Sequence, residues 1–150
     1  MEIVERGATK VVGLQVVATW EELWQKVPKA WRIFAERYTA IEHRMEVPLL
    51  DVSLGKQGET YVELVAAQVS TFGATPEGMV ELEIPRQDYI FYRHTGPVEE
   101  IADSFGKIYQ WAEKNGIPAG EMKIDQGYTP GGNDLYHDLY VKVDKTEMEG

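Results

Sequence analysis

The chain contains no cysteine among its 150 residues. It therefore has neither a disulfide framework nor thiolate ligands for zinc, and cysteine usage leaves the redox compartment open. No apolar run approaches the roughly 20 residues that a helix needs to cross a bilayer, so we expect no membrane contact. Residues 1–6 show neither the basic start nor the apolar run of a secretory signal, which favours the cytoplasm.

Basic residues are scarce: 15 Lys and Arg stand against 25 Asp and Glu, and the net charge is -10. A nucleic-acid surface needs clustered Lys and Arg to displace counterions, so we expect no direct nucleic-acid binding. An acidic protein concentrates cations around itself, which favours a cationic small molecule as the ligand. The alternative is that the charge serves solubility alone. His43, His94 and His137 lack the spacing of a metal site, so we expect neither a metal nor another cofactor.

Hydrophobic periodicity predicts a mixture of strands and two helices within a single domain, residues 1–150. Thr19 is a candidate N-cap, with Glu21 and Glu22 in the first turn of a helix that reaches about Tyr38. Pro28 interrupts that pattern, so we expect two helical pieces or a kink there. The second helix covers residues 98–112. The predicted strands cover residues 9–19, 49–53, 59–71, 79–84, 87–95, 122–128 and 135–143.

The order strand, helix, strand, strand occurs twice. Residues 32–34 and 107–109 have a similar sequence, and so do residues 61–64 and 136–139; both pairs are separated by half the chain length. The alternative is chance similarity. The expected fold class is therefore α+β, built from duplicated βαββ units over about residues 8–71 and 79–143.

Aromatic and Gly-Pro positions in the second half carry a family resemblance. They are Tyr89, Tyr92, His94, Gly96-Pro97 and Ile108-Tyr109-x-Trp111. This order resembles the GyrI-like small-molecule-binding family, whose fold also serves as the effector-binding domain of AraC-type and MerR-type transcription regulators. The resemblance implies a stand-alone, bacterial-type member in which two βαββ units form one antiparallel sheet. It also implies that both helices cover one face of the sheet and that a ligand cleft lies on the other.

Strand alternation suggests which side chains reach that cleft, because successive residues of a strand point to opposite faces. We expect the apolar sets to face the helices: Val62, Leu64 and Ala66 in one unit, and Leu139, Val141 and Val143 in the other. The open face would then carry Tyr61 and Glu63 from the first unit, and Tyr136, Asp138 and Tyr140 from the second. Aromatic faces beside carboxylates suit a flat or cationic ligand. The alternative is an ordinary solvated sheet face.

The resemblance also implies a ligand-binding glutamate two residues before a tyrosine, in the strand after the second helix. Residues 124–128 read Ile-Asp-Gln-Gly-Tyr, without a glutamate. Either Asp125 takes its role from a shifted register, or Gln126 takes its place as a neutral amide. Asp138 matches the family's aspartate in the last strand. Trp24 and Trp31 lie on the first predicted helix, where we expect core packing rather than ligand contact.

Three functional hypotheses follow from these patterns. The first is a small-molecule-binding protein, a monomer or a homodimer, whose aromatic- and carboxylate-lined cleft takes an aromatic compound or a cationic amphiphile. The second, implied by some relatives, is a hydrolase of reactive natural products such as cyclopropane-containing ones, in which Asp125 and Tyr136 would act. The third is a protein-binding regulator such as a gyrase inhibitor. The candidate ligand-binding residues are Trp20, Tyr61, Glu63, Tyr92, Asp125, Gln126, Tyr136, Asp138 and Tyr140.

Overall fold

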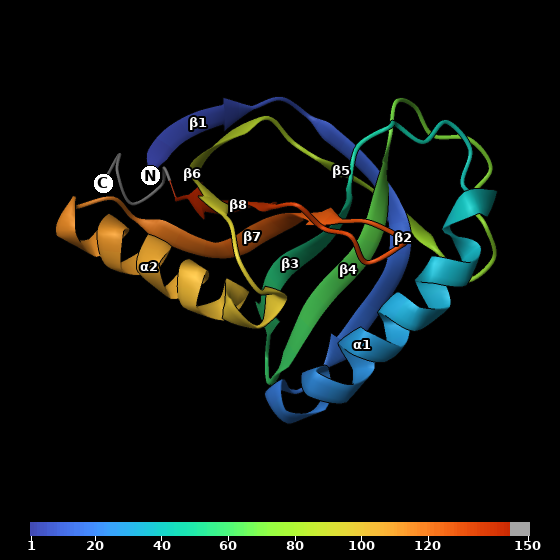
Figure 1. The fold of residues 1–150 in the computed structure, drawn as a ribbon, viewed down its shortest axis with the longest axis horizontal. Helices are drawn as coiled ribbons and strands as arrows, with labels where there is room; N and C mark the ends of the chain where they lie inside the picture. The colour runs from blue at the N-terminus through green and yellow to red at the C-terminus, as the bar shows by residue number, and fades with distance from the viewer. Residues whose placement is uncertain (145–150) are drawn as a thin grey trace.

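The computed structural model describes residues 1–144 and has an α+β fold, in which two helices pack on one antiparallel sheet (Figure 1). The strands are β1 (Glu2–Arg6), β2 (Thr9–Ala18), β3 (Leu49–Gln57), β4 (Thr60–Val69), β5 (Val80–Ile84), β6 (Gln87–His94), β7 (Ala119–Tyr128) and β8 (His137–Val143). The helices are α1 (Trp20–Arg37) and α2 (Ile101–Lys114), with short 3-10 turns at Tyr38–Ala40 and Val98–Glu100. The predicted α+β class is confirmed.

The sheet has the strand order β1-β6-β8-β7-β3-β4-β2-β5, and every pair is antiparallel. Each half of the chain contributes a βαββ segment, and the two segments meet where β3 pairs with β7. Outward from this central pair, the strands follow the order β3, β4, β2 in the first unit and the equivalent order β7, β8, β6 in the second. This symmetry supports the duplication read from the sequence, which itself stays a prediction.

Short connections make the sheet curl. Gly7 and Ala8 alone link β1 at one edge to β2 near the other, and Pro85 and Arg86 alone link β5 to β6. Connections of this length reach only about 10 Å, so the two edges must approach each other. Figure 1 shows β1, β5 and β6 curving over the side of the sheet away from α1 and α2. The sheet therefore has a concave face as well as a helix face.

The helix α1 begins with a capping box. The Thr19 hydroxyl accepts a hydrogen bond from the Glu22 amide, and the Glu22 side chain accepts one from the Thr19 amide. The predicted N-cap is thus confirmed. Of the two alternatives expected at Pro28, the division into two pieces is excluded, because α1 is continuous from Trp20 to Arg37, and a kink stays a prediction. Pro28 removes one backbone donor from the interior of this helix, and its own side chain is exposed.

Both faces of the sheet are apolar. On the helix face, α1 packs over Val65, Ala67 and Val69, and α2 packs over Leu139 and Val141. The concave face has its own buried cluster, made of Val11, Leu50, Val52, Leu64, Ala66, Ile84, Tyr89 and Ile124. This second core results from the curl, since the two edges of the sheet pack against its centre.

The prediction that Leu64 and Ala66 face the helices is therefore wrong, because both lie in the concave cluster. The corresponding prediction for Leu139, Val141 and Val143 is confirmed. Neither helix in the described part of the chain is long and apolar enough to cross a membrane.

Candidate functional site

Two carboxylates lie side by side at the centre of the helix face. The register of the sheet aligns Val65 of β4, Asp51 of β3, Asp125 of β7 and Leu139 of β8 in one row. Val65 packs under α1 and Leu139 under α2, so the row runs from one helix to the other. Asp51 and Asp125 thus occupy the gap between the helices, where neither helix covers the sheet.

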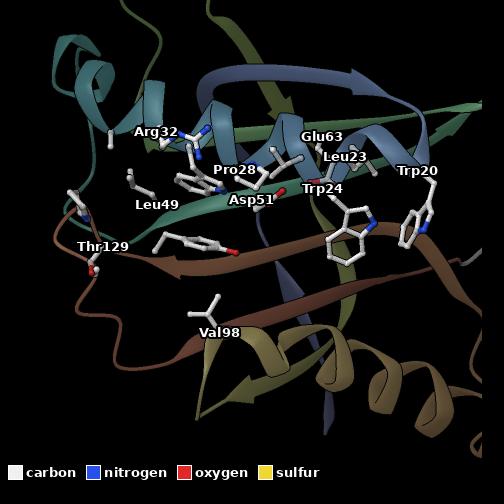
Figure 2. Close-up of a pocket in the computed structure, with 16 residues that line it drawn as sticks. Trp20, Leu23, Trp24, Pro28, Arg32, Leu49, Asp51, Glu63, Val98 and Thr129 are labelled. Atoms are coloured by element: carbon white, nitrogen blue, oxygen red, sulfur yellow. The ribbon is translucent and has the colours of Figure 1, made fainter.

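A cavity of about 800 Å³ opens over this gap. Figure 2 shows Trp20 and Trp24 projecting from α1 into the space between the helices, with Val98 facing them from the segment that leads into α2. Asp51 and Glu63 reach the same space from the sheet. The other lining residues are mainly apolar: Leu23, Val27, Pro28, Trp31, Arg32, Ala35, Leu49, Tyr128, Thr129, Pro130 and Gly132. The cavity has the size and composition of a small-molecule site.

Asp51 has an unfavourable environment for a charged carboxylate. Its Oδ1 atom is shielded from solvent and has no hydrogen-bond partner within residues 1–144. Burial raises the pKa of Asp51 well above its usual range, and repulsion from Glu63, a hydrogen bond with Glu63 and repulsion from Asp125 add to the rise. A hydrogen bond with Trp31 acts in the opposite direction. A positive charge in the cavity would therefore stabilise the ionised form of the Asp51 carboxyl group.

Asp125 is held by two hydrogen bonds. The Tyr128 hydroxyl donates to Asp125 Oδ2 at 2.8 Å, and His137 Nδ1 lies 2.6 Å from Asp125 Oδ1. His137 Nε2 contacts the Asp134 carboxylate at 2.9 Å, so both ring nitrogens face carboxylates and both act as donors. Burial lowers the pKa of His137, but the hydrogen bonds to Asp125 and Asp134 outweigh it, and the net shift is upward. Burial, followed by repulsion from Asp125, raises the pKa of Tyr128, which keeps its phenol protonated.

An irregularity in the pairing of β7 with β3 determines which side chain lies on the same face of the sheet as Tyr128. Leu49 pairs with Tyr128 but Leu50 pairs with Gln126, so the register shifts between the two pairs. Because of this shift, Asp125 lies on the same face as Tyr128, although three positions separate them. Gln126 lies on the concave face, where its side chain accepts a hydrogen bond from Arg6 and donates to Gln68. The geometry favours Asp125 over Gln126 as the group that could replace a glutamate.

Four of the sequence-derived candidates lie near the cavity. Trp20 and Glu63 line it, and Tyr61 contacts Trp20 with a centroid separation of 5.7 Å. Asp125 does not line the cavity itself but accepts a hydrogen bond from Tyr128, which does. Glu63 accepts a hydrogen bond from Ser53 at 3.2 Å. The helix face thus carries acids and aromatic rings together, whereas the prediction placed Tyr61 and Glu63 on the opposite face.

The remaining candidates lie elsewhere. Asp138 forms a two-pronged ion pair with Arg93, and the Arg93 guanidinium stacks on the Tyr136 ring at 3.8 Å. Tyr140 stacks under Arg6 at 4.7 Å on the concave face. Tyr92 packs into the apolar cluster under α2. Gln126, Asp138 and Tyr140 line a hollow of about 470 Å³ on the concave face, as expected of a cleft opposite the helices, whereas the cavity of about 800 Å³ lies between the helices. Tyr136 and Asp125 occupy opposite faces, so they do not form the pair expected of a hydrolase.

Sequence reasoning missed several residues of the cavity. Trp24 and Trp31, which we expected to pack in the core, both line it, and Trp24 is 71% exposed. Tyr128 stacks on Trp31 with centroids 4.4 Å apart. Asp51 carried a usable signal, since it is a single acid inside the apolar sequence Leu-Leu-Asp-Val. Such an acid is expensive to bury and is therefore a candidate for function.

Histidines do not form a metal centre in the part of the chain that the structure describes, where no cluster of three His, Asp or Glu side chains is arranged around a common point. His94 has a structural role: Nδ1 contacts the Ser104 hydroxyl at 2.7 Å and Nε2 contacts the Pro97 carbonyl at 2.9 Å. These bonds fix the turn that leads into α2.

Comparison with known proteins gives a family match over most of the chain. Residues 2–143 match the family described as integron-associated effector binding protein. The transcriptional regulator BrlR of Pseudomonas aeruginosa is 32% identical over 113 residues, which are 71% of this chain and 39% of BrlR. The chain thus spans well under half the length of that regulator. These matches confirm the resemblance to the GyrI-like effector-binding domains.

Solved structures share the fold at low sequence identity. The structure of SAV2435 bound to tetraphenylphosphonium has a TM-score of 0.76 at 8% identity, covering 98% of this chain and 95% of that one. An integron cassette protein of Vibrio cholerae has a TM-score of 0.71 at 12% identity, covering 95% of both chains.

Proposed function

Because the chain belongs to the family of integron-associated effector binding proteins, we propose that its effector is an aromatic cation that binds between α1 and α2. The observation that carries this proposal is the environment of Asp51. Its carboxyl group lies at the base of an aromatic cavity, and its Oδ1 has no partner in the described structure. A bound cation supplies the charge that this buried group lacks.

Electrostatics favour a positive ligand over a neutral or negative one. Asp51, Glu63 and Asp125 lie close enough for the charges of the last two to raise the pKa of the first. Among the described residues that line the cavity, Arg32 is the sole basic side chain, and it is exposed to solvent. Attraction between a cation and the carboxylates is strengthened here because the apolar walls exclude water.

Aromatic rings favour a ligand with delocalised charge and flat surfaces. Trp31 and Tyr128 stack at an interplanar angle of 32°, and Trp20 and Trp24 meet edge to face with centroids 6.0 Å apart. A cation over such rings gains about 0.5–2 kcal/mol per contact. The tetraphenylphosphonium bound by SAV2435, which shares this fold, is a ligand of this chemical kind.

The proposal is tested by titrating the protein with tetraphenylphosphonium and, separately, with the neutral triphenylphosphine oxide, following tryptophan fluorescence. We expect saturable binding of the cation and much weaker binding of the neutral compound. The variant Glu63→Gln should weaken cation binding by about tenfold or more, because one nearby charge is lost. The matched control is Asp138→Asn, an acid on the concave face, which should bind the cation as the wild type does.

Two results would contradict the proposal. One is equal affinity for the cation and the neutral compound, which would show that charge plays no part. The other is a larger loss in Asp138→Asn than in Glu63→Gln, which would place the ligand on the concave face.

A further inference from the structure

The loop between β7 and β8, residues 129–136, forms part of the cavity wall. Thr129 and Pro130 line the cavity and also line a second hollow of about 560 Å³, so they separate the two spaces. Figure 2 shows Thr129 at the edge of the cavity, where the chain leaves β7. We propose that this wall is a pH-dependent gate: it is shut while His137 carries a proton on both ring nitrogens, and it opens when His137 becomes neutral.

Asp134 holds the two ends of the loop together. Its Oδ1 atom accepts hydrogen bonds from the Thr129 amide and the Thr129 hydroxyl, both at 2.7 Å. Its Oδ2 atom lies 2.9 Å from His137 Nε2. Thr129 is the first residue of the loop and His137 follows the last, so a single carboxylate closes the loop. The closure therefore depends on a proton at His137 Nε2, because two acceptors cannot bond to each other.

His137 can satisfy both of its carboxylate partners only as a cation. The ring is 2% exposed, and Nδ1 lies 2.6 Å from Asp125 Oδ1. A neutral imidazole has one N–H donor and one acceptor nitrogen, so deprotonation leaves one carboxylate without a donor. Asp125 cannot move away, because β7 pairs with a strand on each side, whereas Asp134 lies in a loop. The remaining proton therefore stays on Nδ1, and Asp134 turns to solvent and releases Thr129.

Two other titratable side chains face His137. Tyr128 of β7 meets its ring edge to face at 4.7 Å, and the raised pKa of Tyr128 keeps that phenol protonated. His94 of β6 pairs with His137 across the sheet and is also buried. Its Nε2 donates to the Pro97 carbonyl at 2.9 Å, and its Nδ1 lies 2.7 Å from the Ser104 hydroxyl, which can donate to it. The neutral ring of His94 is thus fully bonded, so the switch is specific to His137.

Acids on the neighbouring strands favour the charged form of His137. Beyond Asp125 lie Asp51 of β3 and Glu63 of β4, and the three carboxyl groups are close enough for their charges to interact. Burial lowers the pKa of His137, but the bonds to Asp125 and Asp134 raise it by more. The charged ring therefore persists above about pH 6.5, the usual value for histidine, and the gate opens as pH rises through the folded value.

The test is an NMR titration of the ligand-free protein from about pH 5.5 to about pH 9, following the ring nitrogens of His137 and the amide proton of Thr129. We expect both signals to change together at a midpoint above about pH 6.5. Above that midpoint, the protection of the Thr129 amide against hydrogen exchange, corrected for the intrinsic effect of pH, should be about ten- to hundredfold lower, because a hydrogen bond to a charged group is lost.

Two variants separate the gate from a general effect of charge. Asp134→Asn removes one of the carboxylates that raise the pKa of His137, so the His137 midpoint should move to lower pH. The matched control is Asp138→Asn, which changes the next residue after His137 in the sequence. Asp138 lies on the concave face, where it pairs with Arg93, so this variant should leave the His137 midpoint unchanged.

A Thr129 signal that does not follow the titration of His137 would overturn the inference, as would a His137 ring that is already neutral at about pH 6. An equal shift of the midpoint in Asp134→Asn and Asp138→Asn would also overturn it. If Asp134→Asn does not fold, the wild-type titration alone decides. The titration needs no effector, so either result leaves the proposed cation site to be judged by its own binding experiment.

Discussion

The replacement Asp51→Asn should make the protein more stable at neutral pH. Asp51 is buried beside two other acids, and its Oδ1 has no partner in the described structure. Asparagine keeps a polar oxygen at this position but carries no charge, so it avoids the cost of the raised pKa, which is about 1.4 kcal/mol for each unit that separates the folded from the unfolded value. We therefore expect the free energy of unfolding at pH 7.5 to rise by about 1–3 kcal/mol, or the melting temperature by about 2–4 °C for each kcal/mol.

The gain should depend on pH in a defined direction. Asp51 has a higher pKa in the folded chain than in the unfolded chain, where it is about 3.9. Between these two values the folded state holds a proton that the unfolded state has released, so the stability of the wild type falls as pH rises. The fall is up to about 1.4 kcal/mol per pH unit and stops above the folded pKa. Asparagine does not titrate, so the advantage of the variant should be small near pH 4 and should grow toward neutral pH.

Urea unfolding of both proteins between pH 4 and pH 8 measures this difference. His137 also has a raised pKa, so its contribution to stability is present below about pH 6.5 and is lost as pH rises through the folded value. It occurs in both proteins and largely cancels in the comparison. The control Asp138→Asn breaks an exposed ion pair with Arg93 and should lower stability by at most about 1 kcal/mol. A less stable Asp51→Asn variant at pH 7.5, or a difference that is constant across the pH range, would refute the reasoning.

Three further changes test the fold and the base of the cavity, each by urea unfolding. Gly13→Ala should cost about 3 kcal/mol or more, because its Cβ would lie 1.9 Å from the Val65 carbonyl oxygen, whereas Gly7→Ala has open space and should cost little. Tyr128→Phe keeps the ring but removes the donor to Asp125, so we expect a loss of about 1 kcal/mol, and no loss would show that this hydrogen bond is unimportant. Thr19→Ala removes the N-cap of α1 and should cost about 1 kcal/mol, with an unchanged stability counting against the capping box.

Local patterns predicted much of the fold. The capping residue Thr19 and the apolar periodicity of residues 98–112 were sufficient to place both helices, because these signals depend only on neighbours in the chain. The strand β1 was not predicted. It is an exposed edge strand of five residues, and it is stabilised by pairing with β6, far away in sequence.

The facing of β4 was predicted wrongly for a physical reason. Residues 64–67 read Leu-Val-Ala-Ala, which is apolar at every position and is buried on both faces of the sheet. Because both alternating sets of side chains are apolar, the sequence pattern cannot tell which set faces the helices. Tyr61 and Glu63 looked like members of a solvated face, but they are the polar end of the strand that passes beneath α1.

The paired carboxylates could not be predicted either. Asp51 and Asp125 are adjacent only because β3 pairs with β7 in one register, and a shift in the same pair brings Asp125 beside Tyr128. The family resemblance implied an acid-and-tyrosine site in this strand, and the sequence left Asp125 and Gln126 as alternatives. The choice between them depends on long-range strand pairing, which a one-residue slip would reverse.

The most direct test of the central claim is a crystal structure of the protein with tetraphenylphosphonium. The account predicts the cation between α1 and α2, with its phenyl rings against Trp31 and Tyr128 and its charge nearest to Asp51 and Glu63. A cation bound instead on the concave face, against Arg6 and Tyr140, would contradict it.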